Sequence, residues 1–145
     1  MEKFKFLSHT ADIKFQAYGK SLSEAFSNAG YALVNSMCKE KISEQKKKQI
    51  RVEGTDYENL LYNFLEEFLF LLDSENFILA RVRKIKISEK KDKTGKEKHY
   101  ELYAEISGDE AANYEFNLDV KAVTYNEMFV KGEKNKYVCQ VVLDV

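Results

Sequence analysis

The chain has 145 residues, with 23 Lys and Arg against 24 Asp and Glu, so its formal net charge of −1 offers no basic excess to indicate nucleic-acid binding. Its length and its hydrophobic content of 44% suit one packed domain, which we expect to span residues 1–145. No apolar run is long enough to cross a bilayer, and charged residues occupy the place of a signal peptide, so we predict a cytoplasmic protein with no membrane partner.

The first part of the chain has a strand pattern followed by a helix pattern. Residues 4–6 and 13–18 show the two-residue alternation of strands. Ser21 and Glu24 then form a capping box, in which each side chain takes an unpaired backbone N–H. Apolar side chains follow at helical spacing through residues 22–37, which predicts an amphipathic helix.

A second unit of the same kind comes next. Residues 50–52 alternate like a strand, and Thr55 with Glu58 gives a second capping box. From Tyr57 to Leu72 a long apolar stripe predicts a second helix. Both helices follow a strand and a glycine, which hints at a repeated strand–helix unit.

The second half of the chain contains only strand patterns. Residues 78–87 are predicted to pair with residues 99–106 across a turn that contains Gly95, and residues 120–130 with 136–143 form another hairpin. The expected fold class is α+β, with two helices packed on one face of a mainly antiparallel or mixed β-sheet.

Charge is distributed unevenly along the chain. Residues 81–98 contain nine basic and three acidic residues, whereas residues 53–75 and 101–119 contain seven and six acidic residues and no basic ones. Lysines on a hairpin edge deter edge-to-edge aggregation, which is one interpretation of the basic run. The other is a contact surface for protein or RNA, because such patches speed encounter with partners of opposite charge.

Several kinds of chemistry find no support in the sequence. Cys38 and Cys139 stand alone, so neither a disulfide nor a zinc site is predicted. No phosphate-binding glycine loop and no Gly-x-Ser-x-Gly motif occurs. With only His9 and His99 as histidines, nucleophilic or nucleotide-driven catalysis by this chain is not expected.

Four ordered motifs, spread over essentially the whole chain, resemble those of the archease family. They are His9-Thr10-Ala11-Asp12-Ile13 with the following residues 19–26, residues 53–69, Lys121-Ala122-Val123-Thr124-Tyr125, and Val142-Leu143-Asp144-Val145. Two positions depart from the family pattern. Asn126 stands where the family usually has His, and Gly108-Asp109-Glu110 stands where Gly-Glu is typical, so no role for that histidine can be transferred.

The resemblance implies an accessory protein of tRNA splicing that is not itself an enzyme. Archeases activate the GTP-dependent tRNA-splicing RNA ligase, their protein partner, by promoting its guanylylation and multiple turnover. They bind a divalent metal, typically calcium, and the matching positions here are Asp12, Asp144 and Val145.

The chemistry of that ligand set agrees with a hard cation. Two Asp side chains and a terminal carboxylate would repel one another unless a proton or a cation lies between them. Oxygen ligands without Cys suit Ca²⁺, with Mg²⁺ or Mn²⁺ as alternatives. We therefore expect the segments around Asp12 and Asp144 to be neighbours.

Other residues are candidates for supporting roles. His9, Lys121 and Thr124 either contact the metal site or the partner, or serve structural roles in a turn and a strand. On the second helix, the face opposite the apolar stripe is a candidate interaction surface, formed by Tyr62, Glu66, Phe70 and Asp73.

Two alternative functions remain open at this stage. One is an RNA- or DNA-binding module that uses the basic 81–98 hairpin, with Tyr100 and Tyr103 as stacking groups. The other is a carboxylate-metal hydrolase, although no second carboxylate cluster is evident in the sequence.

Overall fold

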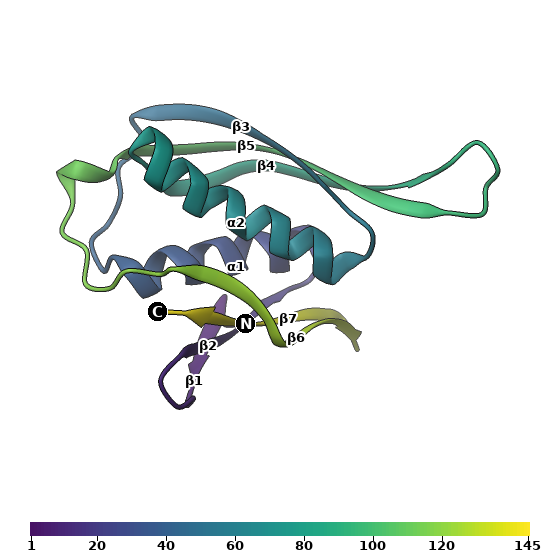
Figure 1. The fold of residues 1–145 in the computed structure, drawn as a ribbon, viewed down its shortest axis with the longest axis horizontal. Helices are drawn as coiled ribbons and strands as arrows, with labels where there is room; N and C mark the ends of the chain where they lie inside the picture. Colours follow the sequence, from purple (N-terminus) through teal and green to yellow (C-terminus); the bar gives the residue numbers. More distant parts are fainter.

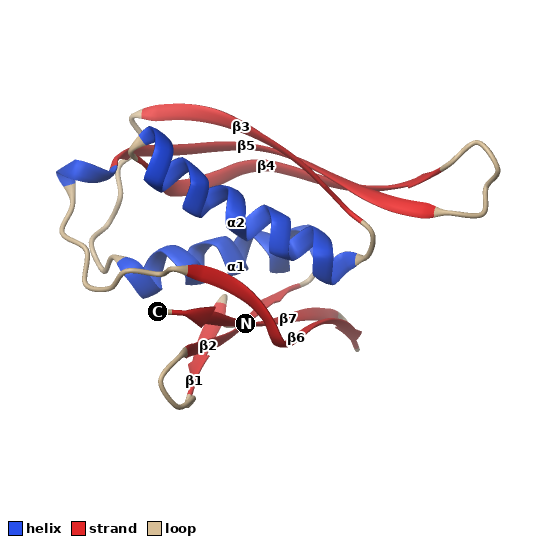
Figure 2. Ribbon diagram, in the orientation of Figure 1, coloured by secondary structure: helices blue, strands red, loops and turns tan.

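The computed structural model describes all residues from Met1 to Val145 and has three layers, with two helices lying between two β-sheets (Figures 1 and 2). The elements, in chain order, are β1 (Phe4–Leu7), β2 (Ile13–Gly19), α1 (Leu22–Met37), β3 (Lys46–Gly54), α2 (Tyr57–Glu75), β4 (Phe77–Lys91), β5 (Lys98–Glu110), the short 3-10 helix η1 (Ala111–Asn113), β6 (Ala122–Glu133) and β7 (Lys136–Asp144).

Both sheets are antiparallel. One has the strand order β1-β2-β7-β6 and the other the order β3-β5-β4. The α+β class and the antiparallel pairing predicted from the sequence are confirmed, and so are the two hairpins in the second half. The strands form two sheets rather than the single sheet expected from the sequence, and the helices lie between them (Figure 2). Apolar side chains of both sheets pack against the helices in one core.

The core lies in this middle layer. Phe26 of α1 and Phe64 of α2 stack with ring centroids 6.2 Å apart, and neither side chain is exposed to solvent. Phe15 of β2 closes the core from one sheet and Leu102 of β5 closes it from the other. Burying each of these side chains contributes about 1.5–3 kcal/mol, which makes the layer the main source of stability.

The N-cap predicted from the sequence is confirmed for α1 but not for α2. The Ser21 hydroxyl accepts a hydrogen bond from the Glu24 backbone N–H at 3.1 Å, as predicted for α1. The predicted Thr55–Glu58 capping box is wrong: Asp56 is the N-cap of α2 and accepts from the Asn59 N–H at 2.7 Å. The Asn59 side chain in turn accepts a hydrogen bond from the Thr55 N–H. Asp56 and Asn59 therefore cap the helix in place of Thr55 and Glu58.

Both helices begin against a glycine at the end of a strand. A Cβ on Gly19 would lie 2.3 Å from the backbone nitrogen of Ala25, and one on Gly54 would lie 2.4 Å from that of Leu60. The strand–glycine–helix pattern seen in the sequence therefore reflects a close approach of strand and helix at both places.

Two further expectations concern the cysteines and the membrane. Cys38 and Cys139 are free and buried, so the prediction that they form no disulfide is confirmed. Neither α1 nor α2 combines the length and apolar character needed to span a bilayer.

Candidate functional site

The loop after β1 and the end of the chain meet where the inner strands β2 and β7 end, and we call this end of the β1-β2-β7-β6 sheet the site edge. Ile13, the first residue of β2, pairs with Leu143, so Asp12 directly precedes and Asp144 directly follows the last pair of the β2–β7 ladder. Asp144 also pairs with Ala122, and its carbonyl oxygen accepts a hydrogen bond from the Lys121 N–H at 2.8 Å. The structure thus brings together three of the motif segments that are far apart in the sequence.

His9 is held at this edge by a carboxylate from β6. Its Nε2 lies 2.7 Å from Oε2 of Glu127, whose other oxygen accepts a hydrogen bond from Lys14 Nζ at 3.1 Å. The hydrogen bond with His9, and then that from Lys14, lower the pKa of Glu127 below its ordinary value. Glu127 is therefore an ionised acceptor, which requires Nε2 of His9 to donate.

The second ring nitrogen of His9 has no partner. Nδ1 is buried, makes no hydrogen bond, and lies 3.6 Å from Oδ2 of Asp12. With the proton on Nε2, the neutral ring presents a lone pair at Nδ1 toward a carboxylate, which is also an acceptor. A cation bound by Asp12 would satisfy both acceptors, so the donor chemistry of this pair fits a cation. The side-chain ligand atoms of His9, Asp12 and Asp144 do not all lie within 4.8 Å of one another, as those of Glu53, His99 and Glu101 do.

Thr124 and the bulge that follows it shape the outer surface of the site. The Thr124 hydroxyl donates to the Val142 carbonyl at 2.9 Å and accepts weakly from the Asn126 N–H at 3.3 Å. Pairing of β6 with β7 is then interrupted up to Phe129, and Glu127 adopts a left-handed conformation with φ 54°. The bulge aims the Glu127 carboxylate back across the sheet toward His9.

A model of the Archease protein family (MTH1598/TM1083) matches residues 4–145. The chain belongs to the archease family. The protein named Protein archease from Sulfurisphaera tokodaii is 34% identical over 148 residues and that from Pyrococcus abyssi is 36% identical over 149, each comparison covering both full lengths. The solution structure of Methanobacterium thermoautotrophicum protein 1598 covers all of both chains at 28% identity with a TM-score of 0.79. A Thermotoga maritima crystal structure, titled an archease and possible chaperone, has a TM-score of 0.56 at 19% identity and supports the fold alone.

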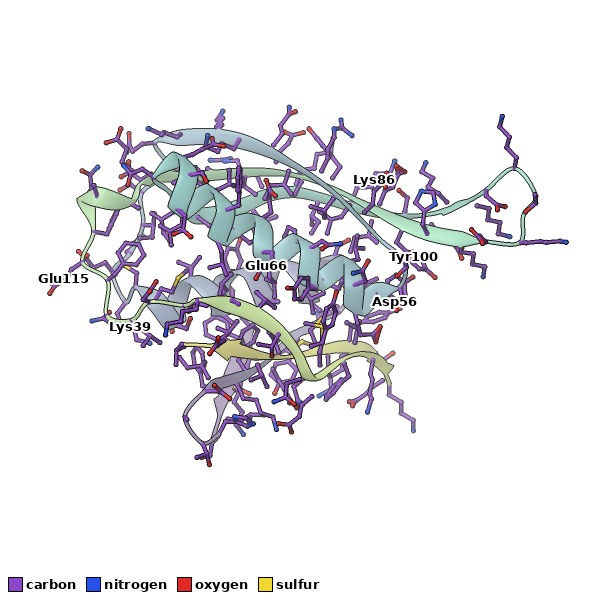
Figure 3. The ribbon with its side chains drawn as sticks, in the orientation of Figure 1. Lys39, Asp56, Glu66, Lys86, Tyr100 and Glu115 are labelled. Atoms are coloured by element: carbon purple, nitrogen blue, oxygen red, sulfur yellow. The ribbon has the colours of Figure 1, made fainter.

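In this archease-family chain the α2 surface predicted from the sequence is only partly free. Tyr62 stacks on Tyr125 of β6, with ring centroids 4.3 Å apart, and Glu66 accepts a hydrogen bond from the Val123 N–H at 2.8 Å. Both side chains therefore attach β6 to α2, and neither is free for a partner; Figure 3 shows Glu66 on the side of α2 that faces β6. Phe70, 53% exposed, and the neighbouring Asp73 remain at the surface.

The two tyrosines proposed for nucleic-acid stacking, Tyr100 and Tyr103, lie on opposite faces of the β3-β5-β4 sheet. Tyr100 turns toward α2, where its ring centroid lies 4.4 Å from that of Tyr57, so its prediction as an accessible stacking group is wrong. Figure 3 shows Tyr100 near Asp56, with Lys86 on the other side of the sheet. Tyr103 lies three residues further along β5, so its side chain points to the opposite, outer face of the sheet, beside Arg51.

Two contacts between polar side chains were not predicted from the sequence: that of Glu127 with His9, and the cluster of Glu53, His99 and Glu101. Glu127 lies in none of the motifs, and only the fold shows that the bulge in β6 directs it to His9. On the outer face of the other sheet, Glu53, His99 and Glu101 bring one ligand atom each within 4.8 Å of one another. Cross-strand register, which joins Glu53 to Glu101, is the signal that would have found this cluster.

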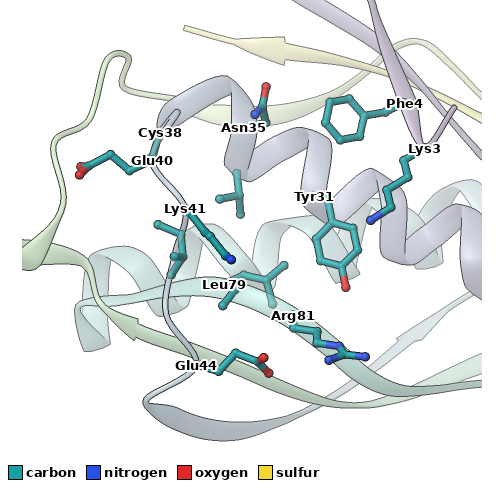
Figure 4. A pocket seen from close by; sticks show the side chains of 13 residues that line it. Lys3, Phe4, Tyr31, Asn35, Cys38, Glu40, Lys41, Glu44, Leu79 and Arg81 are labelled. Carbon is teal, nitrogen blue, oxygen red and sulfur yellow. The ribbon is translucent and has the colours of Figure 1, made fainter.

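The pocket in Figure 4 is separate from the site. It has a volume of about 520 Å³ and opens between α1 and β4, with Tyr31, Leu79 and Arg81 in its wall. The Tyr31 hydroxyl accepts a hydrogen bond from the Val82 N–H at 2.8 Å, which ties the helix to the strand there. None of the site residues predicted from the sequence lines this pocket.

Proposed function

We propose that this protein is an accessory factor that activates the GTP-dependent tRNA-splicing RNA ligase, by promoting its guanylylation and multiple turnover, and that it does so with a bound divalent cation. Membership of the archease family supports the class of function. The observation that carries the cation proposal is the unpartnered, buried Nδ1 of His9 beside Asp12, at the edge where the chain ends.

The ligands in this proposal are Asp12, Asp144 and the α-carboxylate of Val145, with His9 beside them. Calcium is the expected ion, with Mg²⁺ or Mn²⁺ as alternatives, because carboxylates dominate the donor set. The cation would supply positive charge that lets three carboxylates share one edge. The chain's own residues orient the site: Glu127 holds His9 by its Nε2, and the β6–β7 pairing holds Asp144 through its backbone.

Calcium titration calorimetry tests the cation site. Asp12→Asn, Asp144→Asn and a one-residue extension after Val145 should each weaken calcium binding by about tenfold or more, because each removes or displaces a charged ligand. Asp73→Asn is the matched control, since Asp73 is exposed on α2 away from this edge, and should leave binding unchanged. Unchanged titrations in all three site variants would exclude the assignment.

A ligation assay tests the activity. The cognate ligase, GTP, a divalent metal and a cleaved tRNA substrate are combined with and without this protein, and both product formation and guanylylated ligase are measured. We expect multiple-turnover ligation to accelerate and guanylylated ligase to accumulate, with both effects lost in Asp12→Asn. A ligation rate that is the same with and without the protein would refute the proposed function.

A further inference from the structure

The β4–β5 hairpin extends well beyond the body of the molecule (Figures 1 and 3). The last residue of β3, Gly54, pairs with Tyr100, and Tyr100 pairs with Glu89, so the hairpin continues past this row without a third strand. We call residues 90–99 the arm. It contains five lysines against one Asp and one Glu, and residues 90–98 are all exposed.

Four lysines of the arm and its base have no carboxylate within 4.0 Å, whereas Lys90 lies 4.0 Å from Glu101. No ion pair within 4.0 Å forms at Lys91, Lys93 or Lys96 of the arm, or at Lys86 at its base. Lys98 by contrast is paired with Glu89 at 3.2 Å. Free lysines on an arm that projects into solvent produce a positive field which local acidic groups do not neutralise.

A groove of about 710 Å³ runs along the outer face of the β3-β5-β4 sheet at the base of the arm. Lys86, Tyr103 and Arg51 form one row across its three strands. The Arg51 guanidinium carbon lies 4.5 Å from the centroid of the Tyr103 ring, whose hydroxyl donates to Glu105 at 2.8 Å. The row thus joins two cations without carboxylate partners to an aromatic ring that is held in place.

We propose that the arm and this groove form a docking surface for RNA, with the lysines on its phosphates and the Arg51–Tyr103 pair against a base. This inference does not rest on the ligase activity proposed above. Lysines bind phosphates through charge alone, without apolar contacts. Aromatic and guanidinium planes stack on any base, whatever its sequence.

The composition of the arm favours RNA over a protein partner. Protein interfaces are anchored by buried aromatic and apolar side chains and are depleted of Lys, whereas residues 90–99 contain no apolar side chain. The carboxylates of Glu53 and Glu101 interrupt the cationic surface within the groove. At that point an amino group on a base, rather than a phosphate, is the matching partner.

Fluorescence anisotropy with a labelled RNA stem-loop tests the proposal. The arm variant replaces Lys86, Lys91, Lys93 and Lys96 by Gln. The control replaces four lysines that are exposed elsewhere and equally free of ion pairs, namely Lys5, Lys20, Lys131 and Lys134. The two variants lose the same charge, and circular dichroism verifies that both are folded.

The arm variant should bind RNA at least about tenfold more weakly at low salt, and the slope of log affinity against log salt should flatten by about 2 to 3. Tyr103→Leu should cost about fivefold or more in affinity, because it removes a stacking face. The control variant should change affinity less than about twofold.

Three results would overturn the proposal. Equal losses in the arm and control variants would show that only net charge matters. Binding of polyglutamate as tight as that of RNA would show attraction to any polyanion. An arm variant that binds RNA normally but no longer stimulates the ligase would make the arm a protein contact, and would leave the proposed function standing.

Discussion

Gly54→Ala should destabilise the protein strongly, because the end of β3 has no room for a side chain. An added Cβ would lie 2.4 Å from the backbone nitrogen of Leu60 and 2.6 Å from its Cα, about 1 Å closer than ordinary contact. Leu60 is fully buried in the first turns of α2, so the helix would have to move away from the core. We expect a loss of about 3 kcal/mol or more, at the upper end of overpacking effects.

Urea denaturation followed by circular dichroism measures this loss, and a thermal scan should show Tm lower by roughly 10 °C. Gly132→Ala is the control, because its Cβ would meet Tyr137 Cε1 at 3.3 Å, the end of a half-exposed side chain that can move. We expect the control to stay within about 0.5 kcal/mol of wild type. If Gly54→Ala unfolds at the same urea concentration as the control, the close approach of β3 and α2 is not a constraint.

Other outcomes follow from single contacts. The hydrogen bonds that lower the pKa of Glu127, first that with His9, contribute stability that is complete above its ordinary value of 4.5 and is lost as pH falls through the lower folded value. Glu127→Gln should therefore flatten the acid limb of stability against pH, measured by urea titrations at several pH values. Asp56→Ala removes the N-cap of α2 and should lower the free energy of unfolding by about 1 kcal/mol in the same assay. Cys38 and Cys139 should resist a thiol reagent until the protein unfolds, since both are buried and burial raises the pKa of Cys139; rapid labelling of the native protein would contradict this.

The sequence predicted the elements better than their assembly. Alternation identifies which residues of a strand face a core, as Phe15 and Leu102 do, but it contains no information on which sheet the strand joins. That choice depends on long-range packing. The apolar stripe of α2 was predicted, but the contacts of Tyr62 and Glu66 with β6 were not. A helix face that packs polar side chains on a strand has the same residue pattern as a face exposed to solvent, so the sequence does not distinguish the two.

The candidate site was predictable only where its residues lie within motifs. Asp12 and Asp144 were expected to be neighbours, and the β2–β7 register brings their segments together. Glu127 was missed because its role depends on a backbone irregularity, a left-handed residue in a bulge, which no hydrophobic period encodes. The bulge brings the Glu127 carboxylate within 2.7 Å of His9 Nε2, and this hydrogen bond sets which ring nitrogen of His9 carries the proton.

The two proposed surfaces belong to different sheets, which makes their tests independent. His9, in the loop between β1 and β2, and Asp144 of β7 belong to the β1-β2-β7-β6 layer, whereas Lys86 and Tyr103 lie on the outer face of the β3-β5-β4 sheet. Both helices lie between the two sheets (Figure 1). At physiological ionic strength, exposed charges interact little beyond about 8 Å. Loss of arm lysines should thus leave calcium binding intact, and loss of Asp12 should leave RNA binding intact. The near-zero net charge of the chain is thus the sum of a lysine-rich arm and of acidic residues elsewhere, and the two proposed sites lie in different parts of that distribution.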